Sequence, residues 1–273
     1  MSAVRRSPLR WLGDHFAIIA ALLVLGYLFL PVAYVFLFSF NDHGRSNIIW
    51  QGFTLDHWKN PCGYEDVCSS LVTSVQIAVL ATVTAVALGT LIALAMVRYR
   101  FRGRGAMGVL IFVPMATPEI VMGASLLTIF VQGFSRFGIS MGFWTIFAAH
   151  VMFCLSFVVV TVKARLQSLD PRLEEAAQDL YASPSGTFWK VTFPLIVPGI
   201  IGAAMLSFSL SFDDFIITNF VSGDAKTFPM FVYTEAQKGL HAEANVIGFS
   251  LFLAALLLVL AATVVSSLRK PRS

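Results

Sequence analysis

Three carboxylates lie within long apolar stretches of this sequence. Glu119 is about halfway along the stretch 106–132, and Asp213 and Asp214 lie towards the end of the stretch 194–222. A charged side chain at the centre of a bilayer costs about 2.5 kcal/mol or more, so it normally faces a cavity or a partner. Glu119, with backbone carbonyls freed beside Pro114 and Pro118, therefore indicates a polar pathway. A protonated or hydrogen-bonded Glu119 that fixes helix packing is the alternative.

The adjacent pair Asp213-Asp214 suggests an entrance for a cation. The pair follows Pro194 by 19 and 20 residues, which is about 28–30 Å along an ideal helix. We therefore expect both acids near the outer mouth of the span, where adjacent carboxylates suit a cationic substrate that enters from outside. Interfacial acids that reach water, or that cap the following turn, are the alternative interpretation.

Histidine and cysteine offer two further kinds of chemistry. His150 and Cys154 are four residues apart and share one helix face. They lack a nearby acidic or histidine partner, so they make a poor metal site, and we expect a buried histidine that is hydrogen-bonded to a neighbouring helix. Cys62 and Cys68 lie together in the polar stretch 41–69. On an oxidising side of a membrane they can form a disulfide, and two free thiols are the alternative.

The composition requires a membrane around these groups. The chain has 273 residues, of which 57% are hydrophobic and 12% charged, whereas a soluble domain carries about 25% charged residues. We expect an all-α integral membrane protein with one transmembrane domain over residues 1–273. The apolar runs are long enough to cross a bilayer and predict six transmembrane helices, at about 16–40, 70–97, 106–132, 142–164, 194–222 and 244–268. The first is interpreted as a retained signal-anchor helix, because it is too long for the apolar core of a signal peptide.

Basic residues predict the orientation, because they concentrate in the cytoplasmic segments of membrane proteins. With the N-terminus inside, the outer segments hold five of the 19 basic residues: Arg45, Lys59, Arg136, Lys226 and Lys238. The inner segments hold the other 14: Arg5, Arg6, Arg10, Arg98, Arg100, Arg102, Arg104, Lys163, Arg165, Arg172, Lys190, Arg269, Lys270 and Arg272. This bias predicts an N-in, C-in topology. It also explains the net charge of +4 without a nucleic-acid-binding patch.

The loop 165–193 is the longest polar stretch that this topology places in the cytoplasm. Asp170 before Pro171 is typical of a helix start, and Glu174 and Glu175 then lie near the positive end of that helix. Ser183 before Pro184 repeats the signal, so we expect a second short helix that ends before Pro194. Two capped helices between two spans indicate a docking surface, and an ordinary amphipathic surface loop is the alternative.

The same loop resembles the EAA loop of bacterial ABC-importer permeases, through Glu175-Ala176-Ala177 and the downstream Phe193-Pro194. The resemblance implies a type I importer permease fold in which this loop forms coupling helices that sit in a groove of a separate ATPase. That family usually has glycine where this chain has Tyr181, and leucine at Phe193. Tyrosine has a steric cost at positive φ that glycine lacks. The coupling residues carried over are Asp170, Glu174, Glu175, Ala176, Ala177, Asp179, Tyr181, Ala182 and Pro194.

Three further stretches resemble the spermidine/putrescine permeases of this family: Pro118-Glu-Ile-Val-Met-Gly123, Val162-Lys-Ala-Arg-Leu166 and Ser211-Phe-Asp-Asp-Phe215. The resemblance implies the smaller second permease of a polyamine importer. Its partners would be a homologous permease, two ATP-binding subunits, an external binding protein, membrane lipid and a small cationic substrate. ATP and Mg²⁺ would bind to the ATPase, so this chain is expected to carry no cofactor.

Other functions are weighed against this interpretation. Relatives that carry ferric iron, thiamine, opines or phosphonates share the coupling loop, and the Asp213-Asp214 pair is what favours polyamines. A stand-alone secondary transporter often has internal repeats with paired broken helices, and no convincing repeat is present. The sequence holds no G-x-x-x-x-G-K-[ST] phosphate loop, so an ATPase of that kind is excluded and the chain is not expected to be an enzyme.

Overall fold

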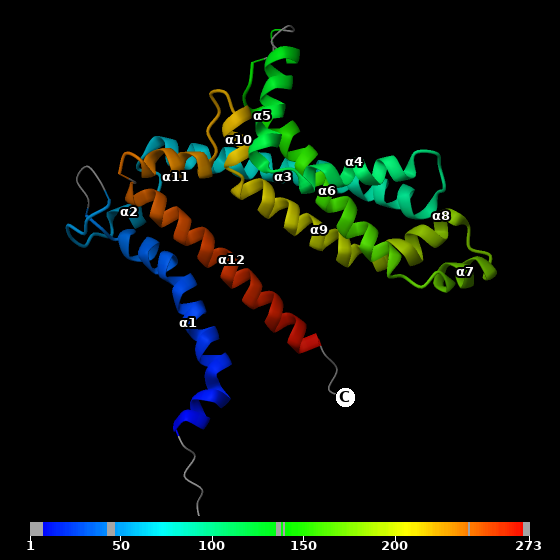
Figure 1. The fold of residues 1–273 in the computed structure, drawn as a ribbon, viewed down its shortest axis with the longest axis horizontal. Helices are drawn as coiled ribbons and strands as arrows, with labels where there is room; N and C mark the ends of the chain where they lie inside the picture. Colours follow the sequence, from blue (N-terminus) through cyan, green and yellow to red (C-terminus); the bar gives the residue numbers. More distant parts are fainter. Residues whose placement is uncertain (1–7, 43–46, 135–137, 139, 240, 270–273) are drawn as a thin grey trace, which may run out of the picture. The chain divides into compact units, whose positions relative to one another are not determined.

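The computed structural model describes residues 8–42, 47–134, 138, 140–239 and 241–269, and every element named within them is helical (Figure 1). The α-helices are α1 Pro8–Phe38, α2 Asp56–Lys59, α3 Glu65–Arg98, α4 Arg104–Ala116, α5 Glu119–Ile129, α6 Phe143–Gln167, α7 Arg172–Asp179, α8 Pro184–Thr187, α9 Phe193–Asp213, α10 Ile216–Val221, α11 Phe228–Ala236 and α12 Ala242–Arg269. Two π-helical turns, η1 Phe130–Phe134 and η3 Phe188–Thr192, join some of them. Of the basic residues that carry the orientation, Arg5, Arg6, Arg45, Arg136, Lys270 and Arg272 lie outside the described residues.

The described chain contains the membrane-spanning helices that the sequence predicts. Five helical stretches are long and apolar enough to cross a bilayer, and the number is six if the bent pair α4 and α5 forms one span. The all-α fold is therefore confirmed. The five single stretches are Phe16–Phe38, Asp66–Arg98, Phe143–Gln167, Pro184–Asp213 and Ala242–Ala261.

The third span is broken between α4 and α5, which meet at an angle of 109°. Thr117 and Pro118 are both extended, with ψ values of 132° and 134°. A residue before proline is disfavoured in the helical region, so Thr117 ends α4 and Pro118 starts a new direction. The predicted break is present at Pro118, whereas Pro114 lies inside α4, and the break places Glu119 at the first position of α5.

The fifth span differs from the prediction at both ends. Pro194 does not separate a short helix from the span, because α8, η3 and α9 form one helical stretch of 30 residues from Pro184 to Asp213. Proline is tolerated in the first turn of α9, and the wider π-helical turn before it keeps the chain helical. At the other end the helix stops at Asp213 instead of continuing to residue 222, and α10 begins at Ile216.

The chain divides into two compact units, residues 1–68 with 234–273, and residues 69–233. In the first unit α1 packs against α12 through aromatic side chains. The ring centroids of Phe36 and Phe249 are 4.5 Å apart, and Phe29 meets Phe252 edge to face. Much of the remaining apolar surface of α1 is exposed, as expected of a helix that faces lipid.

In the second unit α6 packs against α4, α9 and α10 around an apolar core. Close approach of the helices depends on small residues. A Cβ atom on Gly89 of α3 would lie 2.6 Å from Cγ1 of Val158 in α6. Any larger side chain at Gly89 would therefore push α3 away from α6.

Candidate functional site

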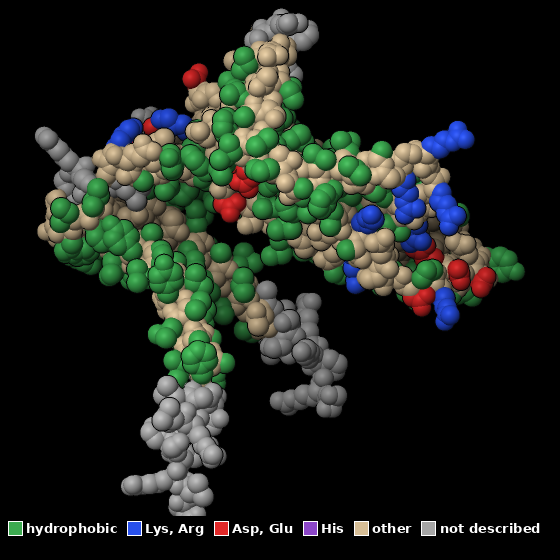
Figure 2. Space-filling view, viewed as in Figure 1, with side chains coloured by type: hydrophobic (Ala, Val, Ile, Leu, Met, Phe, Trp, Pro, Cys, Tyr) green, Lys and Arg blue, Asp and Glu red, His purple; other side chains and the backbone are tan. Residues whose placement is uncertain are grey.

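The three acids singled out in the sequence come together in the second unit. Glu119 at the start of α5 interacts electrostatically with Asp213, the last residue of α9, and with Asp214. Glu119 and Asp213 are exposed, whereas Asp214 is buried. Figure 2 shows acidic side chains gathered where α9 ends and α5 and α10 begin. The site therefore has two carboxylates at the surface of the chain and one internal carboxylate.

Sequence reasoning placed these acids along their own spans and did not predict that they would meet. The sequence put Asp213 and Asp214 near the outer mouth and Glu119 halfway along its own span. The packing of α5 on α10 explains why they meet, because a Cβ on Gly123 of α5 would lie only 2.5 Å from Cδ2 of Phe220 in α10. This close contact between the backbone of α5 and the ring of Phe220 holds α5 beside α10, which follows directly after Asp213 and Asp214.

Asp214 is a structural acid that joins three helices. Its Oδ2 accepts hydrogen bonds from the backbone N–H and the hydroxyl of Thr218, each at 2.8 Å, and Oδ1 accepts from the N–H of Ile217 at 3.4 Å. Oδ2 also lies 3.3 Å from Nε2 of His150 in α6. Asp214 thus caps the turn that starts α10, which is the alternative that the sequence left open.

His150 is the buried, hydrogen-bonded histidine that the sequence predicts. Its Nδ1 lies 2.7 Å from Oγ of Ser211, and its Nε2 lies 2.9 Å from Oγ1 of Thr218. Cys154, one turn further along α6, is also buried, and its thiol donates to the carbonyl of Ser207 at 3.5 Å. Both residues of this helix face therefore bond to α9 or α10.

The loop 165–193 forms two capped helices. Oδ1 of Asp170 accepts the N–H of Arg172 at 3.0 Å, and Glu174 and Glu175 lie in the first turn of α7. Ser183 caps α8 by accepting the N–H of Gly186 at 3.2 Å. The two helix starts are confirmed, with α7 beginning one residue later than Asp170-Pro171 suggested.

Tyr181 makes the turn between these helices in the left-handed region, with φ of 62°. The N–H of Tyr181 donates to the carbonyl of Gln178 at 2.9 Å, and the N–H of Ala182 donates to that of Ala177 at 3.1 Å. These two bonds form the Schellman motif that normally ends in glycine. The tight turn is therefore made without glycine, and the Tyr181 side chain is left 98% exposed.

Replacing Tyr181 with glycine is expected to stabilise this turn. A left-handed conformation costs a residue with a Cβ roughly 1–2 kcal/mol, and glycine removes most of that cost. Amide hydrogen exchange at Ala182 should slow by about fivefold, which corresponds to about 1 kcal/mol. Tyr181→Ala is the matched control, since it removes the ring but keeps the Cβ. Equal exchange in the two variants would show that the backbone there is not strained.

Two links between the loop and the spans were missed by sequence reasoning. Glu174 pairs with Arg98 at the end of α3, and its Oε1 also accepts the hydroxyl of Thr192 at 2.6 Å. Arg165 in α6 donates from Nε to the carbonyl of Leu195 in α9 at 3.0 Å. The sequence had explained Arg98 as a topology signal only, and no local pattern relates it to a residue 76 positions away.

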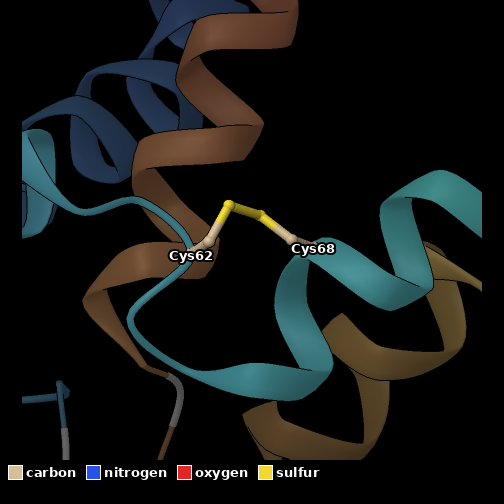
Figure 3. The surroundings of a disulfide bond; sticks show 2 residues. All are labelled: Cys62 and Cys68. Atoms are coloured by element: carbon tan, nitrogen blue, oxygen red, sulfur yellow. A yellow bond between two sulfur atoms is a disulfide. The ribbon is translucent and has the colours of Figure 1, made fainter.

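In the first unit a disulfide joins Cys62 to Cys68, whose Cα atoms are 5.4 Å apart (Figure 3). Cys62 lies in the loop before α3, and Cys68 lies in the first turns of that helix. The bond closes a short loop with a sequence separation of 6. By the loop-entropy relation it should stabilise this segment by about 2 kcal/mol.

Mass spectrometry of the purified chain tests this disulfide. Under non-reducing conditions we expect a peptide in which Cys62 and Cys68 are linked, so that only Cys154 reacts with an alkylating reagent after denaturation. Cys62→Ser should release the thiol of Cys68 for alkylation. Detection of both thiols in the untreated wild type would contradict the disulfide.

A cavity of about 560 Å³ also lies in the second unit, next to the bend between α4 and α5. It is lined mainly by apolar side chains, among them Met107, Ile111, Met122 and Leu155, and by no charged residue. A charged substrate would therefore find no counter-charge there. The acidic site where α5, α9 and α10 meet is the better candidate for binding a cation.

Comparisons with known proteins agree with this architecture. Residues 85–270 match the family model described as binding-protein-dependent transport system inner membrane component. The chain is 36% identical over 244 residues to the spermidine/putrescine transport system permease protein PotC of Escherichia coli, covering 89% of this chain and 90% of that protein. It is 37% identical over 247 residues to the putrescine transport system permease protein PotI of the same species, covering 89% of this chain and 85% of that protein.

Solved structures support the fold. A bacterial ABC transporter involved in the import of the acidic polysaccharide alginate matches with a TM-score of 0.69 and 16% identity, over 96% of this chain and 99% of that one. A chain of the MetNI methionine ABC transporter matches with a TM-score of 0.55 and 19% identity, over 76% of this chain and 100% of that one. The present chain is therefore a multi-pass membrane protein, and it belongs to the family of binding-protein-dependent transport system inner membrane components.

Proposed function

We propose that this chain is the permease subunit of an ATP-driven importer of polyamines such as spermidine and putrescine. The observation that carries the substrate assignment is the meeting of Glu119, Asp213 and Asp214 at the junction of α5, α9 and α10. A polyamine carries several ammonium groups, which carboxylates can bind by charge-assisted hydrogen bonds. The names of relatives that are 36–37% identical, which include spermidine and putrescine, support the same substrate class.

The two exposed acids and the buried acid have different roles in this proposal. Glu119 and Asp213 are exposed on this chain and would bind ammonium groups of the substrate. Asp214 already has its oxygens bonded to Thr218, Ile217 and His150, so it would hold the end of α9 in place instead of binding substrate directly. Its charge still adds to the negative potential that attracts a cation.

Energy would come from a separate subunit. The proposed assembly contains this chain, a homologous permease, two ATP-binding subunits and an external binding protein. The N-in, C-in orientation from the basic residues puts α7 and α8 on the cytoplasmic side, where ATP-binding subunits would lie. Figure 2 shows that Lys and Arg side chains gather at the end of the second unit formed by α4, α7 and α8, which supports a cytoplasmic location for that end.

The proposed mechanism is alternating access. ATP binding closes the two ATPases, and α7 and α8 transmit this closure to the spans as a rigid-body rotation. The polar site near Glu119 then exchanges an inward opening for an outward one, which admits the cation between Glu119 and Asp213. ATP hydrolysis reverses the change and releases the substrate into the cytoplasm.

ATPase activity of the co-purified complex in liposomes tests this function. Spermidine with its binding protein should stimulate hydrolysis by the wild type, and Asp213→Asn should abolish most of that stimulation. Asp224→Asn is the matched control, because Asp224 is an exposed acid in the loop after α10. Stimulation by ferric iron, thiamine, an opine or a phosphonate, with none by polyamines, would overturn the substrate assignment. Uptake by the isolated chain down an ion gradient would instead support a secondary transporter.

A further inference from the structure

A single carboxylate oxygen joins three segments at the end of the second unit. Oε1 of Glu174, in the first turn of α7, pairs with Nη2 of Arg98 and accepts the hydroxyl of Thr192 at 2.6 Å. Arg98 is the last residue of α3, and Thr192 is the last residue of the π-helical turn that leads into α9. We call these three residues the Glu174 link.

Beyond this link, α7 lies against α8 and η3. None of its residues is buried, and only Glu174 and Ala177 are half-buried. Hydrophobic burial, which normally fixes a helix, therefore contributes little to the position of α7. By contrast the side chain of Glu174 is only 18% exposed, and Thr192 is buried.

The link also stands between two cavities. One has a volume of about 440 Å³ and is lined by Arg98 and Glu174 together with the segment that leads into α7. The other has a volume of about 630 Å³ and is lined by the same two residues together with parts of α3, α8 and η3. The ion pair of Glu174 with Arg98 thus lines both cavities and connects α7 to α3.

The surroundings of the Glu174 carboxylate strengthen its bonds to Arg98 and Thr192. Glu174 is stabilised by the amide groups at the start of α7 as well as by Arg98 and Thr192. A fully exposed ion pair contributes about 0–1 kcal/mol, but this carboxylate is largely shielded from water and has a second hydrogen bond. Loss of one partner leaves a shielded charge without its full compensation, which is more costly than loss of a surface pair.

We propose that the Glu174 link transmits displacement of α7 to the ends of α3 and α9. Arg98 and Thr192 are then positioning residues for transport, and neither touches substrate. The inference rests on the proposed function, since it assigns the path by which a docked ATPase moves the spans. Glu175, which follows in the sequence and is exposed, is left free to face the ATPase.

Amide hydrogen exchange tests whether the Glu174 link holds α7 in place, and it needs no assumption about the substrate. In Arg98→Ala and in Thr192→Val, the amides of α7 should exchange at least fivefold faster than in the wild type. Arg98→Lys keeps the charge and should restore part of the protection. Arg102→Ala is the matched control, since it removes an exposed arginine from the loop between α3 and α4. Unchanged exchange of α7 in Arg98→Ala would overturn the proposal.

Transport in proteoliposomes tests the mechanical role. Substrate carried per ATP hydrolysed should fall at least tenfold in Arg98→Ala, and the double variant Arg98→Ala with Glu174→Gln should be no worse than the more impaired single variant. Faster exchange of α7 with a normal transport ratio would reduce the link to a structural contact and overturn the proposal. Failure of the wild type to transport polyamines would overturn the proposed substrate. The hydrogen-exchange result would still test the Glu174 link in that case.

Discussion

Asp214→Ala is expected to destabilise the protein strongly, whereas Asp213→Asn should leave the fold intact and impair transport. The alanine variant removes the acceptor for the N–H groups of Ile217 and Thr218 and leaves His150 buried without its carboxylate. Leaving a buried donor without its acceptor costs about 1–3 kcal/mol for each group. Asp213 is exposed, so its amide isostere loses the charge but little structure.

The buried thiol of Cys154 provides the measurement for this contrast. The other two cysteines of the chain form the disulfide, so a thiol-reactive dye reports the opening of the core around α6. We expect the dye to react at a clearly lower temperature in Asp214→Ala than in the wild type, and at an unchanged temperature in Asp213→Asn. Asp214→Asn, which keeps an acceptor oxygen, should lie between them. Equal temperatures for Asp213→Asn and Asp214→Ala would contradict the structural role of Asp214.

Glu175→Lys is expected to uncouple ATP hydrolysis from transport without unfolding the chain. Glu175 lies in the first turn of α7 and is exposed, and no ion pair is recorded for it in the described part of the chain. The cost of a positive charge at a helix N-terminus is about 0.3–1 kcal/mol, which is small compared with the total stability. The change should therefore act on the surface that faces the ATPase.

Substrate transported per ATP hydrolysed is the quantity to measure for Glu175→Lys. We expect it to fall at least tenfold, because the proposed ATPase would meet a lysine where it now meets a carboxylate. Asp224→Lys reverses an exposed charge in the loop after α10 and should leave the ratio unchanged. A wild-type ratio in Glu175→Lys would remove this surface from the mechanism.

Local signals predicted the elements well. Asp170, Ser183 and Pro118 act through neighbouring backbone groups, so their effect on helix starts could be derived from the sequence. Apolar length likewise predicted the spans, because a bilayer imposes a minimum length on each helix. The exceptions are the two ends of the fifth span, where a π-helical turn lets the helix continue through Pro194 and where the helix stops at Asp213 instead of residue 222.

The candidate site needed the tertiary structure. Nothing near Glu119 indicates that Gly123 will pack on Phe220 and bring Glu119 to the end of α9. The pairing of Arg98 with Glu174 depends in the same way on the packing of distant elements. Helix length placed Asp213 along its own helix, but it held no information about which other helix would reach it.

The uninterrupted helix from Pro184 to Asp213 has a geometric consequence. Its 30 residues measure about 45 Å at 1.5 Å per residue, half as long again as the hydrocarbon core of a bilayer. We expect it to tilt as one body, with the α8 surface at one end and Asp213 at the other. If it pivots at its middle, a tilt of about 10° moves each end by roughly 4 Å in opposite directions. A bend at the π-helical turn Phe188–Thr192 or at Pro198 inside α9 would reduce the displacement that reaches the other end.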